Sequence, residues 1–178
     1  MFYIIIGIIT LVIIIIFAFL IKSFLNKVNV YIIKINEATK NIDLLLEKKL
    51  NLLTKIKDRL KECIEENFME KLPKIKNQNL DSFELDAEIE LMTKELKEVL
   101  EYNKKVILDD ETNILLRNLD RASIDLIATK NYYNDNSEIY NTIISKFPTN
   151  IIAKIKRYDQ LDFYENKKEE EFEILKEK

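Results

Sequence analysis

Three carboxylates have a spacing that could serve metal chemistry. Glu84, Glu88 and Glu95 share roughly one face of a predicted helix. Carboxylate rows of this kind bind iron inside helical bundles, where the sites also take histidines from Glu-x-x-His pairs. The sequence contains no histidine. We therefore interpret the three glutamates as a solvated helix face and expect no metal site.

The remaining residue types give little support for catalysis. No serine, lysine or cysteine has an identifiable activating partner, and histidine, the commonest general base, is missing. The one glycine, Gly7, lies in an apolar run, which excludes the usual glycine-rich nucleotide loops. The net charge is only −3, and the basic residues do not form a stripe that could bind nucleic acid. The sequence thus predicts no enzyme, no cofactor and no nucleic-acid partner.

One repeated pattern is suited to recognition. A Tyr-Asn pair recurs after seven residues, and an asparagine follows further on; the candidate residues are Tyr133, Asn134, Tyr140, Asn141 and Asn150. Tyrosine supplies contact area and a hydroxyl, and asparagine supplies hydrogen bonds, so a partner-recognition patch is one interpretation. The other is a buried polar layer, joined by Thr129, Asn136 and Ser137, that fixes the register of the helices. Of the two we favour the polar layer.

A helix must position these residues. Counting back by sevens from Phe147 gives one line: Tyr140, Tyr133, Leu126 and Leu119. The line is typical of a packed helix face, so we expect the rings of Tyr133, Tyr140 and Phe147 to be buried against the first helix. Each asparagine follows its tyrosine by one residue, about 100° around the helix, at the edge of that packing.

The rest of the chain also favours long helices, since it has one glycine and two prolines. Residues 24 to about 70 predict one helix with apolar lines at seven-residue, coiled-coil-like spacing: Ile35, Ile42, Ile56 and Cys63, and Thr39, Leu46, Leu53 and Leu60. Cys63, the single cysteine, is interpreted as a small core residue.

Prolines and capping residues predict where the later helices begin and end. Pro73 breaks the pattern, and Asp81-x-x-Glu84 is a capping box that starts a second helix. Acids around Asp109 favour the start of a third helix. Pro148 ends that helix, and Thr149 or Asn150 can cap a short fourth one.

The N-terminal run predicts a membrane anchor. From Phe2 to Ile21 there is no charged residue, and a helix of about 20 apolar residues crosses a hydrocarbon core of roughly 30 Å. The run lacks the basic n-region and cleavage site of a signal peptide, so we expect it to be uncleaved. The positive-inside rule places the C-terminal domain in the cytoplasm, because lysines follow the run: Lys22, Lys27, Lys34 and Lys40.

Two blocks of the sequence match a known pattern. The first holds Ile42-Asp43, Leu46, Lys48-Lys49, Leu52-Leu53 and Ile56. The second holds Tyr133-Asn134, Tyr140-Asn141, Ile144, Phe147-Pro148, Asn150 and Ala153, with an aromatic ending at Tyr158, Phe163, Tyr164 and Glu165. In order and spacing, behind an N-terminal anchor, these blocks resemble the LemA family of bacterial membrane-anchored proteins. Thr39, Thr54 and Lys55 depart from the family's Trp, Pro and Asn, which implies a straighter first helix; Ser137 and Lys156-Arg157 also depart.

The resemblance implies an anchored, all-helical antiparallel domain on the cytoplasmic side, in a family with no established enzymatic activity or cofactor. With the residue patterns, it predicts an all-α fold: a transmembrane helix over residues 1–23, a bundle of three long helices and a short fourth over 24–165, and a charged tail over 166–178. We expect a scaffold in the bacterial cell membrane that presents a helical surface to other proteins or to a second copy. The alternative is a membrane-linked sensory or signalling domain that binds a small ligand.

Overall fold

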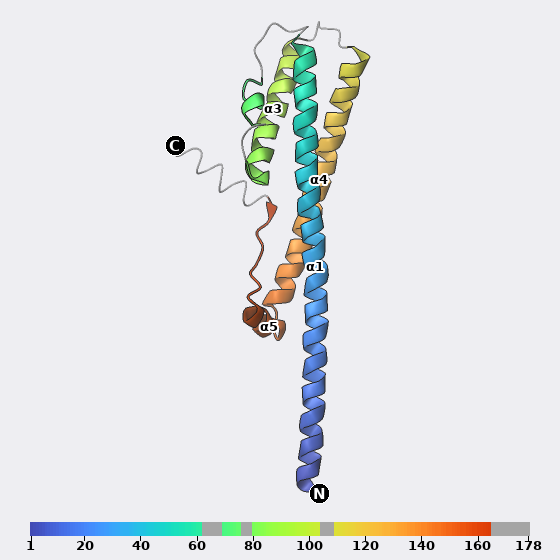
Figure 1. Cartoon of the computed structure of the whole chain (residues 1–178), viewed down its shortest axis with the longest axis vertical. Coiled ribbons are helices and arrows are strands. Elements are labelled where there is room, and N and C mark those ends of the chain that lie inside the picture. Colours follow the sequence, from blue (N-terminus) through green and yellow to red (C-terminus); the bar gives the residue numbers. More distant parts are fainter. Residues whose placement is uncertain (62–68, 76–79, 104–108, 165–178) are drawn as a thin grey trace, which may run out of the picture. The chain divides into compact units, whose positions relative to one another are not determined.

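The computed structural model describes residues 1–61, 69–75, 80–103 and 109–164. Within these ranges every regular element is a helix: α1 (Phe2–Leu60), α2 (Leu72–Ile75), α3 (Ser82–Tyr102), α4 (Asp110–Ser145) and α5 (Thr149–Lys156) (Figure 1). The all-α prediction is confirmed, with three long helices. The short helix α2 was not expected; its Pro73 lies in the first turn, where a missing N–H is tolerated. Cys63 and the tail 166–178 lie outside the described residues.

α1 runs without a break from the apolar N-terminal run into the amphipathic sequence after it. Among its 59 residues α1 has one glycine, Gly7, and no proline. Its run of backbone hydrogen bonds is therefore not interrupted by a proline. Residues 1–20 are exposed along their whole length, whereas Ile42, Leu46 and Leu53 are buried. The apolar run and the first amphipathic helix thus form one element, which ends at Leu60 and not near residue 70 as predicted.

Carboxylates begin both later long helices, as predicted. The Asp81 side chain accepts the N–H groups of Phe83 and Glu84, each at 2.9 Å, and Glu84 accepts the N–H of Asp81 at 3.3 Å, which completes the capping box. Asp109 accepts the N–H of Thr112 at 2.8 Å. Hydrogen bonds from the Thr112 side chain and backbone lower the pKa of the Asp109 carboxyl, which keeps it charged at the helix N-terminus.

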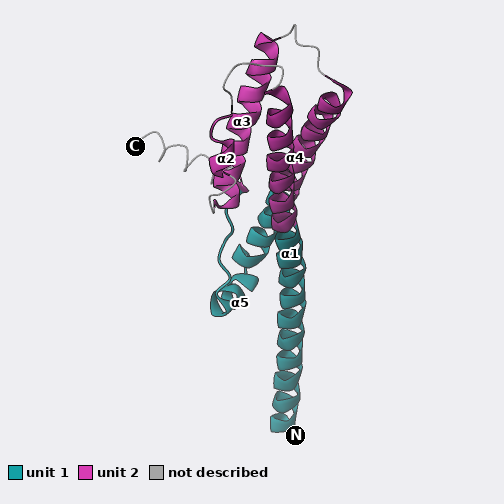
Figure 2. Cartoon of the chain, turned by 45° about the horizontal axis from the view of Figure 1, so that its top comes forward, with its two compact units in different colours: residues 1–37, 133–163 teal, residues 38–132, 164–178 magenta. Residues whose placement is uncertain are grey.

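The chain divides into two compact units, coloured separately in Figure 2. Unit 1 comprises residues 1–37 and 133–163, and unit 2 comprises residues 38–132 and 164–178. Both units draw on α1 and α4, so the boundary crosses two helices instead of falling in a linker. The ranges 1–23, 24–165 and 166–178 stay predictions, because they follow from the membrane span and from composition rather than from compactness.

The helices of unit 2 do not all alternate in direction. The hydroxyl of Ser82, at the start of α3, bonds Asp43 of α1; Arg59, at the end of α1, bonds Asp109 ahead of α4 at 2.7 Å. Near the end of α3, Glu95 accepts the N–H of Met69 at 2.8 Å, and the carbonyl of Met69 accepts Lys57. These contacts set α3 parallel to α1 and α4 antiparallel to both. α1 ends at Leu60, but α3 starts beside Asp43, well before that end. Both helices therefore run in the same direction from there.

The core of unit 2 follows the predicted seven-residue lines. Its buried apolar side chains include Ile42, Leu46, Leu53, Ile56 and Leu60 from α1, Ile89, Met92, Leu96 and Val99 from α3, and Leu119, Ala122 and Leu126 from α4. Thr39, predicted on the same line, is exposed. A hydroxyl-bearing residue gains little from burial there, because the apolar transfer free energy is small.

Unit 1 is built around a smaller cluster: Phe24, Val28 and Ile35 of α1, Tyr140 and Ile144 of α4, and Ala153 of α5. Pro148 follows the end of α4 as predicted, but the predicted side-chain cap of α5 is wrong. Pro148 takes the N-cap position without a side-chain bond. The Thr149 hydroxyl instead lies 2.6 Å from the carbonyl oxygen of Ile143 and 2.7 Å from that of Lys146. Its one proton serves the carbonyl of Ile143, in the last turn of α4, or that of Lys146, just after the helix.

Candidate functional site

The Tyr-Asn repeat holds a segment of the chain's own C-terminal part. The Asn141 amide donates to the carbonyl of Leu161 at 2.7 Å, and its oxygen accepts the N–H of Leu161 at 2.8 Å. The Tyr133 hydroxyl lies 3.4 Å from the carbonyl oxygen of Asp162. Residues 159–163 form no regular element, so their backbone groups need partners outside a ladder. Asn141 supplies both partners for one residue.

The two tyrosines of the repeat are placed differently. Tyr140 is 4% exposed and belongs to the core of unit 1, whereas Tyr133 is half-buried and packs against that core. Burial raises the pKa of both phenols, because it disfavours the charged form. The predicted packing of these rings is confirmed for Tyr140 and partly for Tyr133.

The other residues of the repeat and its neighbours differ in burial. Phe147 is 81% exposed, so its predicted burial is wrong: α4 ends at Ser145, and the heptad line does not continue through the turn before Pro148. Asn134 and Asn150 are half-buried. Asn136 and Ser137 are buried, as expected for polar residues on the packed face. The structure thus brings Tyr133 and Asn141 together around residues 161–162.

The glutamate row does not form a uniformly solvated face. Glu84 serves the cap of α3, and Glu95 is half-buried with its carboxylate on Met69. Glu88 is also half-buried, with one carboxylate oxygen enclosed. The solvated-face prediction is therefore wrong for Glu88 and Glu95, since α2 and the chain around Met69 pack near α3. No group of three metal-binding side chains occurs among the described residues.

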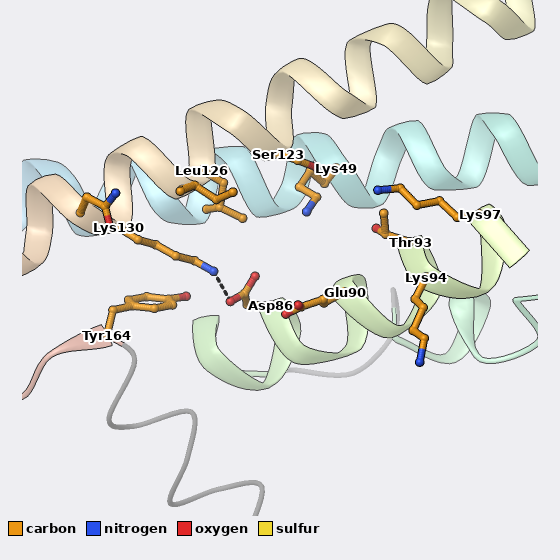
Figure 3. Close-up of a pocket in the computed structure, with 12 residues that line it drawn as sticks. Lys49, Asp86, Glu90, Thr93, Lys94, Lys97, Ser123, Leu126, Lys130 and Tyr164 are labelled. Atoms are coloured by element: carbon orange, nitrogen blue, oxygen red, sulfur yellow. Dashed lines mark hydrogen bonds and ion pairs between the residues drawn. The ribbon is translucent and has the colours of Figure 1, made fainter.

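A charged cavity lies in unit 2, between α1, α3, α4 and Tyr164 (Figure 3). Its volume is about 520 Å³. Lys130 and Asp86 point at one another and form an ion pair whose side chains are 16% and 4% exposed. The Lys130 ammonium also lies 4.8 Å from the centroid of the Tyr164 ring. The Tyr164 ring in turn lies 4.4 Å from that of Phe83, centroid to centroid. This end of the cavity is closed by mutually satisfied groups.

Two hydroxyls of the lining are also engaged inside the protein. The Thr93 hydroxyl donates to the carbonyl of Ile89 at 2.7 Å, and the Ser123 hydroxyl donates to that of Leu119 at 3.0 Å. Lys49 reaches the cavity from α1 and is 6% exposed. Lys94 and Lys97 are exposed at its edge. The arrangement can attract an anion, but it presents no nucleophile with a base beside it.

The residue patterns missed the buried charges of unit 2, although a signal exists. Asp86 precedes Ile89 by three residues on the stripe of α3, and Lys130 follows Leu126 by four on α4. Lys57 lies between Leu53 and Leu60 on α1 and is 8% exposed. Each charge thus occupies an apolar stripe position. A buried charge needs a partner, so such positions indicate ion pairs or buried hydrogen bonds.

α4 also carries an exposed apolar pair, Ile124 and Ile127, which are 67% and 59% exposed. Residues three apart are neighbours on a helix surface, and Ile127 also lines the cavity. The two side chains form a small exposed patch, and Ile127 lines the cavity together with Lys94 and Lys97. We call Ile124 and Ile127 the α4 patch.

Comparison with known proteins gives one match. The model of the LemA family matches residues 38–175. This range holds the candidate residues Tyr133, Asn134, Tyr140, Asn141 and Asn150, the cavity and the α4 patch. The apolar part of α1 lies before it. No curated protein and no solved structure matches the chain.

Proposed function

The chain belongs to the LemA family, and we propose that it is a single-pass, membrane-anchored interaction protein that acts by binding other proteins and not by catalysis. The proposal needs no cofactor and no nucleic acid. It is supported by the residue types, since the sequence has no histidine and keeps its only glycine in the apolar run.

The anchor is supported by α1. Among the described residues, α1 alone is long and apolar enough to cross a membrane, and the apolar window is not buried by the rest of the protein. An exposed stretch of this length is stable where lipid surrounds it. Resistance of the full chain to alkaline carbonate extraction is the expected result; recovery in the soluble fraction would remove the anchor from the proposal.

We place the C-terminal domain in the cytoplasm of a bacterial cell. Lys22, Lys27, Lys34 and Lys40 follow the apolar run, and the positive-inside rule retains such residues on the inner side. Protease added to intact cells should leave the domain whole and digest it only after the membrane is permeabilised. Digestion of intact cells down to a short stub would reverse the orientation.

The α4 patch is the observation that carries the interaction role. Large side chains as exposed as Ile124 and Ile127 contribute little to the fold, yet they offer adjacent apolar contacts on a rigid helix. The cavity that Ile127 also lines contains the Asp86–Lys130 ion pair and two hydroxyls bonded to backbone carbonyls, which favours a structural role over catalysis. A partner protein, or a second copy of the chain, would cover the patch.

A photo-reactive amino acid at position 124 or 127 tests this role in intact membranes. Asp125 is the matched control, because it is exposed on α4 about 100° away from Ile124. Discrete protein adducts should form from 124 and 127 and not from 125. Ile124→Asp combined with Ile127→Asp should release the same partner from a native pull-down while leaving the melting temperature near that of the parent. Equal adducts at all three positions would show that the patch has no special role.

Small-ligand binding is the second candidate function, and the cavity in unit 2 favours it. A volume of about 520 Å³ lies within the usual range for small-molecule sites. The exposed ammonium groups of Lys94 and Lys97 at its edge favour an anion. Native mass spectrometry of the purified full chain should then detect a bound small molecule, which Ser123→Leu should expel by filling the space. A chain that carries no such molecule would leave the interaction role alone.

A further inference from the structure

Unit 1 contains an apolar groove that its own core does not fill. The groove has a volume of about 970 Å³. Phe17, Leu20 and Ile21 line it from α1, at the end of the uncharged run. The other side consists of the last turns of α4, the turn before Pro148, and α5.

α5 is apolar on two sides, but only one side is used by the core. Ala153 is buried, and Tyr158, just beyond the helix, lies 6.5 Å from Phe24 between ring centroids. Ile151 and Ile155, four residues apart and therefore on one helix face, are 53% and 75% exposed. Phe147 is 81% exposed and lines the same groove. Three large apolar side chains thus face outward within a single short segment.

The position of the groove along α1 identifies what surrounds it. Phe17 and Ile21 belong to the last turns before Lys22, the first charged residue. In a membrane-spanning α1, these turns lie where the acyl chains meet the headgroups. Because Phe147, Ile151 and Ile155 line the same groove within the same unit, they lie at that depth.

The charges of the segment fit a headgroup region. Residues 146–157, KFPTNIIAKIKR, contain four basic residues and no acid. Lys146, Lys154, Lys156 and Arg157 are all exposed, and Lys27 of α1 lines the groove with Lys146 and Lys156. Glu138 is the one acid of the lining. Basic side chains are attracted to an anionic membrane surface, and their long stems allow the charged groups to reach the headgroups.

We propose that α5 and the turn before it form an interfacial element that lies in the bilayer crossed by α1. Phe147, Ile151 and Ile155 enter the boundary of the acyl chains, and the basic side chains meet anionic lipid headgroups. This inference rests on the proposed membrane anchor. Lipid is the occupant favoured over a protein partner because the groove is continuous with the apolar run of α1.

Spin labels on the full chain in lipid nanodiscs test the element. Ile151→Cys and Ile155→Cys, made in a Cys63→Ser background, carry the label at the proposed site. Ile13→Cys reports on the span, and Leu44→Cys reports on an exposed apolar side chain of unit 2 outside the α4 patch. In phosphatidylglycerol nanodiscs, labels at 151 and 155 should be more accessible to dissolved oxygen than to an aqueous nickel reagent, as at 13. The label at 44 should show the reverse.

The outcomes separate this inference from the anchor. If position 13 is in lipid but 151 and 155 resemble 44, the interfacial element is wrong and the anchor stands. If position 13 itself is in water, the anchor fails and the inference fails with it. Labels at 151 and 155 that neither reagent reaches would mean that protein covers the groove, which also overturns lipid contact.

A charge reversal tests the anionic component. Lys154→Glu with Lys156→Glu should shift the label at 151 towards water in phosphatidylglycerol and have a smaller effect in phosphatidylcholine. Lys94→Glu with Lys97→Glu, which makes the same change in net charge within unit 2, should leave the label unchanged. Equal shifts from the two pairs, or none from the first, would overturn the headgroup contact.

Discussion

Unit 1 and unit 2 draw on the same two long helices but are held together by different chemistry. Unit 2 buries charged groups within its apolar stripes: Asp86 bonds Lys130, and Lys57 bonds the carbonyl of Met69. Unit 1 relies on the Tyr140 ring in its core and on the Asn141 amide.

The difference follows from what is packed in each unit. In unit 2 helices lie against helices, their backbone groups are already bonded, and side-chain pairs fix the register. In unit 1, α4 receives residues 161–163, which form no regular element. Their backbone N–H and C=O groups need side-chain partners, and an amide offers a donor and an acceptor together. The Tyr-Asn repeat is therefore suited to holding an irregular segment.

The largest expected effect is in unit 2. Asp86→Ala leaves the Lys130 ammonium without its ion-pair partner at a site where that side chain is 16% exposed. Loss of one partner of a buried pair costs roughly 3–5 kcal/mol in the free energy of unfolding. Denaturant unfolding of the full chain in detergent measures the cost, and amide hydrogen exchange should assign it to α3 and α4.

A double variant sharpens this prediction. Asp86→Leu with Lys130→Met replaces the pair by apolar groups, and it should recover most of the lost stability because no charge remains buried. If the double variant is as unstable as Asp86→Ala, packing around Asp86 and not its charge determines the stability of unit 2.

Tyr140→Ala should produce the next largest effect, and it should appear in unit 1. The side chain is 4% exposed in the core cluster with Phe24 and Ile144, and aromatic truncations in cores cost about 3–5 kcal/mol. Hydrogen exchange should accelerate in residues 133–163. Phe147→Ala is the matched control: it removes a ring from the same heptad line, but one that is 81% exposed. Similar losses from both variants would contradict the different burial of the two rings.

These two rings show where sequence reasoning succeeds and where it ends. Periodicity and local capping motifs identified the three long helices, the N-terminal carboxylates of α3 and α4, and the buried lines through Leu53 and Tyr140, because each depends on neighbours along the chain. It extended the line to Phe147, since spacing alone does not show that α4 ends at Ser145.

The contacts of the candidate residues could be identified only from the folded structure. That Asn141 meets Leu161 depends on how the chain turns back after α5, over 20 residues of sequence. The Asp86–Lys130 pair joins residues 44 apart. Charges on the apolar stripes could have been noticed, but their partners could not be identified from spacing.

Asn141→Ala should have a moderate effect confined to unit 1. It removes two hydrogen bonds and leaves the N–H and C=O of Leu161 without their partner. Leaving part-buried polar groups unpaired costs about 1–3 kcal/mol. Exchange of the Leu161 amide should accelerate while α3 stays protected. Asn51→Ala, at an exposed site of α1, is the control and should be neutral. A neutral Asn141→Ala that still weakens partner adducts would instead identify the repeat as a recognition surface.

The smallest expected effect is a difference in how the two units respond to alkali. Burial raises the pKa of Tyr140 above 10.0, so in that range folded unit 1 keeps a proton that the unfolded chain releases. The stability of unit 1 should therefore fall as pH rises through 10.0. Burial lowers the pKa of Lys57 below 10.5. Below 10.5 the unfolded chain holds that proton more tightly, so the contribution of Lys57 to the stability of unit 2 should rise with pH until 10.5.

Two variants isolate these opposite slopes. Tyr140→Phe keeps the ring and removes the phenol, so it should flatten the alkaline loss in unit 1 and delete one late-titrating group from the tyrosinate absorbance. Lys57→Met should abolish the increase in the stability of unit 2 that accompanies rising pH. Unfolding is to be followed on either side of pH 10.0 with the full chain, using limited proteolysis to report on each unit separately. Desolvation is the first cause of both pKa shifts. If stability changed with pH in the same direction in the two units, one of the two side chains would be hydrated in solution.

If Tyr140→Phe left the alkaline loss of stability unchanged, the half-buried Tyr133 phenol would be its source, and Tyr133→Phe should then remove the loss.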